Sequence, residues 1–300
     1  MSLNWNKAKQ YVVPTVKYGI VIACSIMIYI QLHNKILSPS NILDSIKSMP
    51  LFLIPLMCGI SLLSWLVESK KWQLLVNDFY GLRFRESVIQ NITSQAASFI
   101  TPFRSGEYGL KALYFPAHGK KTVMDRTLVG NMSQMMVTVG LGLIGLVCYV
   151  DDPAYLGSIV VALLFVIAAV ALSYRWIKNK YDITSVHPFM WMKTVGYSML
   201  RYMIFSANWI LALSILEVPL YPLDMLIGVA VFYLVVSILP LMQLLDIPVR
   251  LAVASFVFLG VEMDNQIVVV TGLVWISNTL FPTLLGCLLL PAINFKALQL

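Results

Sequence analysis

Charged side chains are scarce in this 300-residue chain, in which Asp, Glu, Lys and Arg together make up 12% of the residues. A soluble domain has roughly 25% charged residues. With 59% hydrophobic residues and a mean hydropathy of +0.81, the chain has too few charges to cover a water-exposed surface. The sequence therefore predicts an all-α, polytopic membrane helix bundle that forms a single domain over residues 1–300, because no polar linker is long enough to separate two domains.

Acidic residues and histidines are scarce as well, with 14 and 3 copies. The sequence has no phosphate-binding G-x-x-x-x-G-K-[ST] loop, no H-E-x-x-H motif and no aspartate-rich cluster. The 4 cysteines lie in apolar runs without metal-ligand spacing, so we interpret them as small apolar side chains. A membrane-embedded enzyme normally needs several such groups converging on one point. We therefore expect neither an enzyme nor a cofactor or metal site.

The net charge of +7 arises in short loops between apolar segments, which is typical of topology signals and not of a nucleic-acid-binding surface. Lys and Arg are concentrated in region 68–128 and in the turn at 175–180, which we therefore place in the cytoplasm. The opposite loops carry acids only (Asp151, Asp152, Glu217, Asp224, Glu262 and Asp264). This pattern places both termini in the cytoplasm. The first apolar stretch lacks a cleavage site and is expected to be a retained helix.

Six apolar segments reach the length of about 20 residues that a spanning helix needs. We predict these spans at about 15–33, 49–67, 129–150, 155–177, 195–216 and 266–290. Four further segments reach only about 18–24 Å as helices: about 86–101, 106–117, 225–239 and 249–261. They form two pairs, the first folded about Pro102 and the second about Pro240, and we interpret them as two re-entrant helical hairpins over 86–117 and 225–261. The alternative for the second pair is a continuous helix 225–244 followed by a short crossing.

The two predicted hairpins lie in different halves of the chain, about 1–150 and 151–300. The charge pattern has the first hairpin entering from the cytoplasm and the second from outside. This arrangement is typical of transporters built from inverted repeats, which bind their substrate near the bilayer midplane. We therefore predict an inverted repeat.

The first hairpin carries the strongest candidate site. Pro102 is predicted to end the incoming helix, and Gly106 is predicted to permit the turn. Glu107 and Lys111 are four residues apart and so share one helix face, while Arg104 and the free N–H groups at the helix start suit a phosphate. Because charged groups in hydrocarbon usually mark a site, we interpret this segment as a binding site for an anionic headgroup. The alternative is an ordinary solvated ion pair.

The second hairpin carries a similar pattern. Asp246 and Arg250 are also four residues apart, and Pro248 is predicted to lie in the first turn of a new helix. Arg250 lies in an otherwise apolar helix, which again indicates a site. For Asp246 the alternative is a helix cap.

Other polar residues lie inside predicted spans. Arg201 could join the site or extend toward the cytoplasmic interface. Gln134, Asn208 and Asn278 could line the same cavity or hydrogen-bond between helices. The stretch Lys70–Glu86 is typical of an amphipathic helix on the membrane surface.

A family resemblance rests on three features of the first half: Lys71-Trp72, the sequence Pro-Phe-Arg-Ser-Gly-Glu at 102–107, and the basic Lys111 four residues after the glutamate. Together they resemble the lysylphosphatidylglycerol synthase transmembrane (flippase-like) family. The segment 247–250 is similar to that family's second motif, which ends in Gly-Val-Arg-Glu. Lys111 replaces the usual arginine, Leu251 stands where the family has glutamate, and Gln134 stands where an acid is common.

The resemblance implies a flippase-like transporter of the bacterial cytoplasmic membrane. Its substrate would be an anionic phospholipid or a polyprenyl-phosphate-linked saccharide, moved between leaflets. No synthesis of lysyl-lipid is expected, because the soluble aminoacyl-transfer domain is lacking. The resemblance implies a substrate-binding role for Arg104, Glu107, Asp246 and Arg250. The alternative function is a non-transporting accessory or scaffold subunit of a lipid or envelope-glycan synthesis system, in which the chain would bind an enzyme or form a homo-oligomer.

Overall fold

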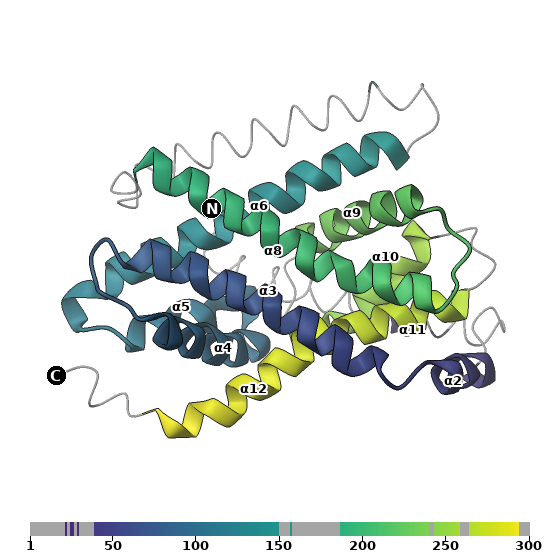
Figure 1. Ribbon diagram of the computed structural model, residues 1–300, viewed down its shortest axis with the longest axis horizontal. Helices are drawn as coiled ribbons and strands as arrows, with labels where there is room; N and C mark the ends of the chain where they lie inside the picture. The colour runs from purple at the N-terminus through teal and green to yellow at the C-terminus, as the bar shows by residue number, and fades with distance from the viewer. Residues whose placement is uncertain are drawn as a thin grey trace, which may run out of the picture.

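The computed structural model describes residues 39–149, 187–239, 243–258 and 264–293, with isolated positions at 22, 25, 26, 29 and 157. Every regular element in this part of the chain is helical (Figure 1). The longer helices are α2 (Pro39–Ser48), α3 (Leu53–Val76), α4 (Phe84–Ile100), α5 (Ser105–Leu113), α6 (Lys120–Tyr149), α8 (Pro188–Ile215), α9 (Pro222–Ile238), α10 (Ile247–Val257), α11 (Asp264–Trp275) and α12 (Phe281–Leu289). Short helical turns connect them: η1 (Pro102–Arg104), η2 (Ala117–Gly119), η4 (Gln243–Leu245), the π-helical η5 (Ile276–Leu280) and η6 (Leu290–Ala292).

Four helical stretches among the described residues are long and apolar enough to cross a membrane: Leu53–Val76, Ala117–Tyr149, Phe189–Ile215 and Asn265–Ala292. The chain is therefore a helical membrane protein, as its composition predicts. These stretches correspond to four of the six predicted spans. The other two, about 15–33 and 155–177, lie outside the described residues.

The four short segments predicted from the sequence are also helices. They form a first helix pair, α4 with α5, and a second helix pair, α9 with α10. The first break falls at the predicted proline, since Pro102 begins η1, and Pro248 lies in the first turn of α10 as predicted. Pro240, about which the second pair is predicted to fold, lies outside the described residues. The alternative of a continuous helix 225–244 is wrong, because the backbone leaves the helical conformation at Leu239 (φ −89°, ψ 106°).

The predicted amphipathic surface helix at Lys70–Glu86 is also wrong. Helix α3 continues through Val76, the chain turns, and α4 starts at Phe84. Trp72 and Val76 are fully buried and pack with Phe115 in a hydrophobic cluster. The last two turns of α3 therefore pack against protein. The polar residues near the end of α3 do not mark a helix on the membrane surface.

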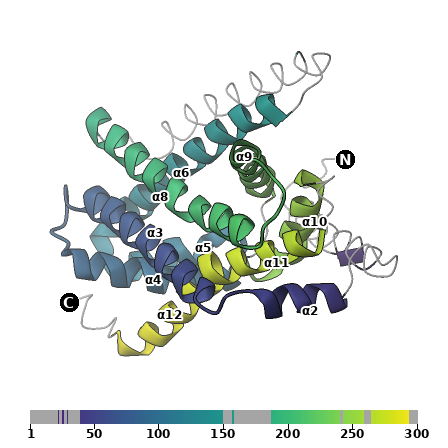
Figure 2. The same ribbon diagram turned by 45° about the vertical axis from the view of Figure 1, so that its right-hand side comes forward.

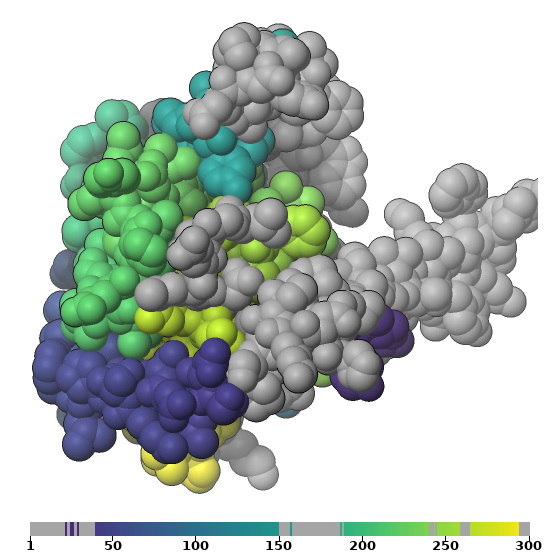
Figure 3. Space-filling model, turned by 90° about the vertical axis from the view of Figure 1, so that its right-hand side faces the viewer, coloured from purple at the N-terminus to yellow at the C-terminus, as the bar shows by residue number. Residues whose placement is uncertain are grey.

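Helices α3 and α8 pack side by side through the middle of the structure (Figures 1 and 2). Each helix pair lies beside α3 and α8 and packs against a helix from the opposite half of the sequence. Helix α4 lies on α12, and α9 lies on α6. At one end of the molecule the purple α2, the green segment of α8 and α9, and the yellow-green α11 share one face (Figure 3).

Asparagine side chains connect the long helices at depth. Asn208 of α8 donates to the Asn278 Oδ1 atom at 2.7 Å and to the carbonyl of Met57 at 3.1 Å. Asn278 in turn donates to the carbonyl of Phe205 at 3.1 Å. Asn278 lies in η5, where the π-helical geometry changes the hydrogen-bonding pattern of the last span. Of the two alternatives for these residues, the structure shows the hydrogen bond between helices.

Helix α4 touches its neighbours backbone to backbone at two glycines. A Cβ atom on Gly286 of α12 would lie 2.2 Å from the carbonyl oxygen of Ile92. A Cβ atom on Gly106 of α5 would lie 2.3 Å from the carbonyl oxygen of Ala97. Small residues permit such close approach between membrane helices. These contacts fix α4 between α5 and α12.

We predict that Gly286→Ala destabilises the protein by about 1–3 kcal/mol, because the added methyl group overpacks a backbone contact that cannot move aside. Gly140→Ala on α6 is the matched control, because its Cβ atom meets nothing within 4 Å. Alanine favours a helix over glycine by about 1 kcal/mol, so the control should unfold at the same temperature or higher. Thermal unfolding followed by circular dichroism in detergent measures both. Equal behaviour of the two variants would contradict the close contact between α4 and α12.

Candidate functional site

The acid and base of the first motif form a buried ion pair at the start of α5. Lys111 Nζ lies 2.9 Å from Glu107 Oε1, and Arg104 Nη2 lies 3.2 Å from Glu107 Oε2. Glu107 is 5% exposed and Lys111 is 2% exposed, whereas the Arg104 side chain is 38% exposed. The alternative of a solvated surface pair is therefore wrong. These three residues are named the first triad.

The backbone that presents Arg104 is strained. Phe103 (φ 54°) and Arg104 (φ 56°) both adopt the left-handed conformation, which costs roughly 1–2 kcal/mol per residue. The sequence predicts this turn at Gly106, but Gly106 lies in the first turn of α5. Its missing side chain serves the contact with Ala97, and its N–H donates to Thr101 Oγ1 at 2.8 Å. Strain of this kind persists where the surrounding structure enforces it, often at functional sites.

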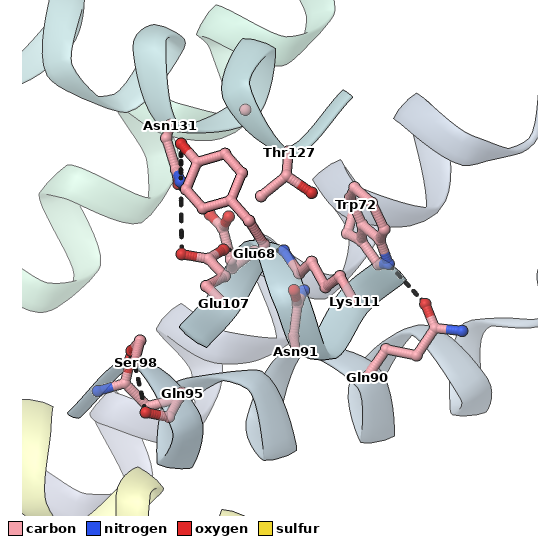
Figure 4. Close-up of polar contacts among 12 residues, drawn as sticks. Glu68, Trp72, Gln90, Asn91, Gln95, Ser98, Glu107, Lys111, Thr127 and Asn131 are labelled. Carbon is pink, nitrogen blue, oxygen red and sulfur yellow. Dashed lines mark hydrogen bonds and ion pairs between the residues drawn. The ribbon is translucent and has the colours of Figure 1, made fainter. Parts of the chain in front are cut away.

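Two further residues hold the first triad in place. Asn131 of α6 donates to Glu107 Oε2 at 3.4 Å and to the Tyr108 hydroxyl at 3.1 Å. The Lys111 ammonium group lies 4.2 Å from the centre of the Trp72 ring, within the range of a cation–π contact. The ammonium group thus has a carboxylate and an aromatic face as partners in the interior (Figure 4).

A second group of three buried charges lies between α3 and α8. Lys71 Nζ is 2.6 Å from Glu68 Oε2, and Arg201 Nη1 is 3.3 Å from the same oxygen. Lys71 also donates to the Gly130 carbonyl and the Ser198 hydroxyl, each at 3.2 Å. We name Glu68, Lys71 and Arg201 the second triad. Of its members, sequence reasoning identifies only Arg201 as a site residue. The sequence signal for Glu68 and Lys71 is an acid and a base three residues apart at the end of an apolar run.

Arg201 is enclosed by protein groups. Its side chain is 14% exposed, it pairs with Glu68, and its guanidinium group lies 5.0 Å from the centre of the Trp65 ring. Glu68, Glu107 and Lys111 point toward the same interior space (Figure 4). The two triads therefore form one charged cluster.

The cluster carries excess positive charge. Its two glutamates and four basic residues sum to +2. Burial raises the pKa of the Glu107 carboxyl, but the charges of Lys111 and Arg104 outweigh burial and hold that pKa well below its ordinary value. Glu107 is therefore ionised at neutral pH. Because an unmatched buried ion costs several kcal/mol, the cluster is suited to an anionic ligand.

Free hydrogen-bonding atoms accompany this charge. Among the described residues, the Nε atoms of Arg104 and Arg201 and both amide atoms of Gln134 are buried without a hydrogen-bond partner. Gln134 follows Asn131 by three positions on α6, so the two lie on the same side of that helix, one turn apart. Buried polar atoms are normally paired, which makes these groups candidates for contacts with a ligand.

The side of α4 that faces the protein interior carries polar side chains. The interpretation of 86–101 as an apolar segment does not predict them. Its buried polar residues are Ser87, Gln90, Asn91, Thr93, Ser94, Gln95 and Ser98. Gln90 accepts a hydrogen bond from Trp72 Nε1 at 2.7 Å (Figure 4), and Gln95 donates to Gln243 Oε1 at 2.9 Å. The second bond joins the first helix pair to η4, at the tip of the second pair.

The second motif forms a balanced pair of its own. Arg250 Nε lies 2.8 Å from Asp246 Oδ2, and Trp275 donates to Asp246 Oδ1 at 2.9 Å. Asp246 occupies the N-cap position of α10, as the capping alternative predicts, but its side chain makes no cap hydrogen bond and pairs with Arg250 and Trp275 instead. In the described part of the chain no ion pair joins Asp246 or Arg250 to either triad. Phe99 of α4 packs at 6.2 Å from Trp275, which places this pair near the end of the first helix pair.

No protein-family model, curated protein or solved structure matches the chain. The resemblance to the flippase-like family thus stays a prediction. Interpretation of the site rests on its own geometry.

We predict that Glu107→Gln destabilises the protein by about 3–5 kcal/mol, because Lys111 and Arg104 lose the carboxylate that compensates them. The double variant Glu107→Gln/Lys111→Met removes one of these cations and should recover a large part of that loss. Denaturation in detergent measures the free energy of unfolding of each variant.

The control for this cycle is Glu86→Gln. The Glu86 side chain is 49% exposed, so this substitution should change the free energy of unfolding by less than about 1 kcal/mol. The single variant Lys111→Met completes the cycle. If the loss of unfolding free energy in the double variant equals the sum of the losses in the two single variants, Glu107 and Lys111 are not coupled and the buried pair is wrongly assigned.

Proposed function

We propose that the protein moves the headgroup of an anionic lipid between the leaflets of a bacterial cytoplasmic membrane. The lipid would be an anionic phospholipid or a polyprenyl-phosphate-linked saccharide, whose chains stay in the bilayer while the headgroup passes through the protein. The observation that carries this proposal is the buried cluster with an excess charge of +2 inside a helical membrane protein. Ionisable groups inside a membrane usually line a substrate path.

The residues of the cluster take different roles in this proposal. Arg104 is the most exposed member and makes the first contact with the headgroup. Arg201 and Gln134 offer buried, unpaired atoms for contacts deeper in the protein. Glu107 and Glu68 keep the basic groups oriented and lower the cost of the empty site. Binding and orientation are sufficient for this function, and no bond is made or broken.

The packing of the helices supports an inverted repeat. In the proposed equivalence, α3, α4, α5 and α6 correspond to α8, α9, α10 and the last span. Helix α3 packs on its counterpart α8, while α4 packs on the last span and α9 packs on α6. Such reciprocal contacts are what a two-fold relation produces. Combined with the charge pattern of the loops, the equivalence has the two helix pairs entering from opposite sides of the membrane.

We expect Arg104→Ala to slow the movement of anionic lipids by about tenfold or more, because a charge-assisted hydrogen bond of about 1.5–3 kcal/mol is lost. The fold should persist, since Glu107 keeps Lys111 as its partner. Proteoliposomes with acyl-labelled phosphatidic acid, phosphatidylglycerol or phosphatidylcholine, probed by quenching of the outer leaflet, measure the rate for each lipid.

Arg83→Ala is the matched control, because it removes the same charge from a side chain that is 88% exposed. If the unaltered protein moves neither anionic lipid faster than protein-free liposomes do, the transport proposal is wrong. Copurification of a lipid or glycan synthesis enzyme would then favour the accessory role.

We expect the first helix pair to begin and end on the cytoplasmic side. After replacement of the native cysteines, Gly81→Cys and His118→Cys should react with an impermeant thiol reagent from that side, and Tyr221→Cys from the other. All three positions are open for labelling, as Gly81, His118 and Tyr221 are exposed. Reaction of Gly81→Cys and His118→Cys from opposite sides would show that this pair crosses the membrane, which contradicts the re-entrant hairpin.

A further inference from the structure

The two triads repeat one arrangement. In each, a glutamate is shared between a lysine and an arginine: Glu107 between Lys111 and Arg104, and Glu68 between Lys71 and Arg201. Each lysine lies closer to its carboxylate than the arginine does, at 2.9 against 3.2 Å and 2.6 against 3.3 Å. Each lysine–glutamate pair is neutral, so each triad has one arginine in excess.

The two excess arginines come from different parts of the chain and face one cluster. Arg104 belongs to η1 and Arg201 to α8, and each is paired with a glutamate, Glu107 or Glu68, that points toward the same interior space (Figure 4). In the described structure each has a buried Nε atom that no hydrogen bond uses. A guanidinium group presents its N–H donors in a rigid fork that matches the oxygens of a phosphate.

We propose that the two arginines hold a doubly charged phosphate group, as in a phosphomonoester or a diphosphate, in preference to the singly charged phosphodiester of common phospholipids. This inference rests on the proposed function and narrows its substrate class. The group can belong to a lipid headgroup or to free phosphate, since the recognising chemistry is the same.

Charge balance is the reason for this preference. A phosphomonoester carries a charge of about −1.5 to −2 at pH 7 and has three strong acceptor oxygens. It can therefore neutralise both triads and accept bonds from both arginines. A phosphodiester carries one charge, which leaves one cation unmatched in the interior at a cost of several kcal/mol.

The test compares two soluble lipid analogues that differ by one methyl group, dodecyl phosphate and dodecyl methyl phosphate. Binding to the full chain in detergent is measured by calorimetry at a pH well above the second phosphate pKa of about 6. We expect dodecyl phosphate to bind about tenfold more tightly or better, as one added charge-assisted hydrogen bond implies. Below that pKa both analogues carry one charge, and the preference should shrink.

The variant that tests the mechanism is Arg201→Gln. It should fold, because Glu68 keeps Lys71 at 2.6 Å. It should lose the preference, because its affinity for dodecyl phosphate should fall by about tenfold, to a value close to its affinity for the methyl ester. Lys193→Gln is the matched control, since Lys193 lies on the same helix and is exposed; it should retain the preference.

Equal affinity of the unaltered protein for the two analogues would overturn the doubly charged ligand and leave the transport of anionic lipids standing. Failure to bind either analogue would overturn both proposals. If dodecyl phosphate is preferred, competition by inorganic phosphate shows whether the bound phosphate group belongs to a lipid headgroup or to free phosphate. Displacement at similar concentrations indicates free phosphate as the ligand, and resistance to displacement indicates a lipid headgroup.

Discussion

In each triad a carboxylate is shared between two cations, which lets Lys71, Lys111 and Arg201 lie inside an apolar helical protein beside the partly exposed Arg104. A buried ammonium or guanidinium group without a partner costs several kcal/mol, so Glu68 and Glu107 determine whether the interior of this bundle can hold its charges at all. The rest of the structure serves to bring them together. Helix α3 supplies one glutamate, the first helix pair supplies the other, and α6 and α8 close the space around them. The site is therefore a property of the whole packing arrangement rather than of one motif.

Sequence reasoning predicts the parts of the fold that depend on local rules. Segment length separates the four described spans from the short helices, and Pro102 and Pro248 mark helix boundaries because proline cannot continue a helix interior. The spacing of Glu107 and Lys111 correctly predicts a shared helix face.

The parts of the site that depend on tertiary packing were not predicted. Lys71 follows another lysine at the edge of a basic region, so it resembles a topology signal, yet it is 1% exposed. The only local signal for Glu68 is its spacing of three residues from Lys71, and its partner Arg201 lies 133 positions along the chain from it, the difference of the two residue numbers. Gly106 was assigned to the turn because glycine tolerates a positive φ, whereas its role is a contact with Ala97 that only the folded structure shows.

The close contact of α4 with α12 has a consequence for how the protein is made. Ile92 and Gly286 touch through the backbone, although most of the chain separates them. Reciprocally, Gly142 and Gly145 of α6 approach Leu234 and Ala230 of α9. During synthesis α4 is therefore made long before its last partner, α12. Neither half can complete its core alone, so assembly ends with a slow, long-range docking step, and until that step the polar side of α4 lacks its final partner.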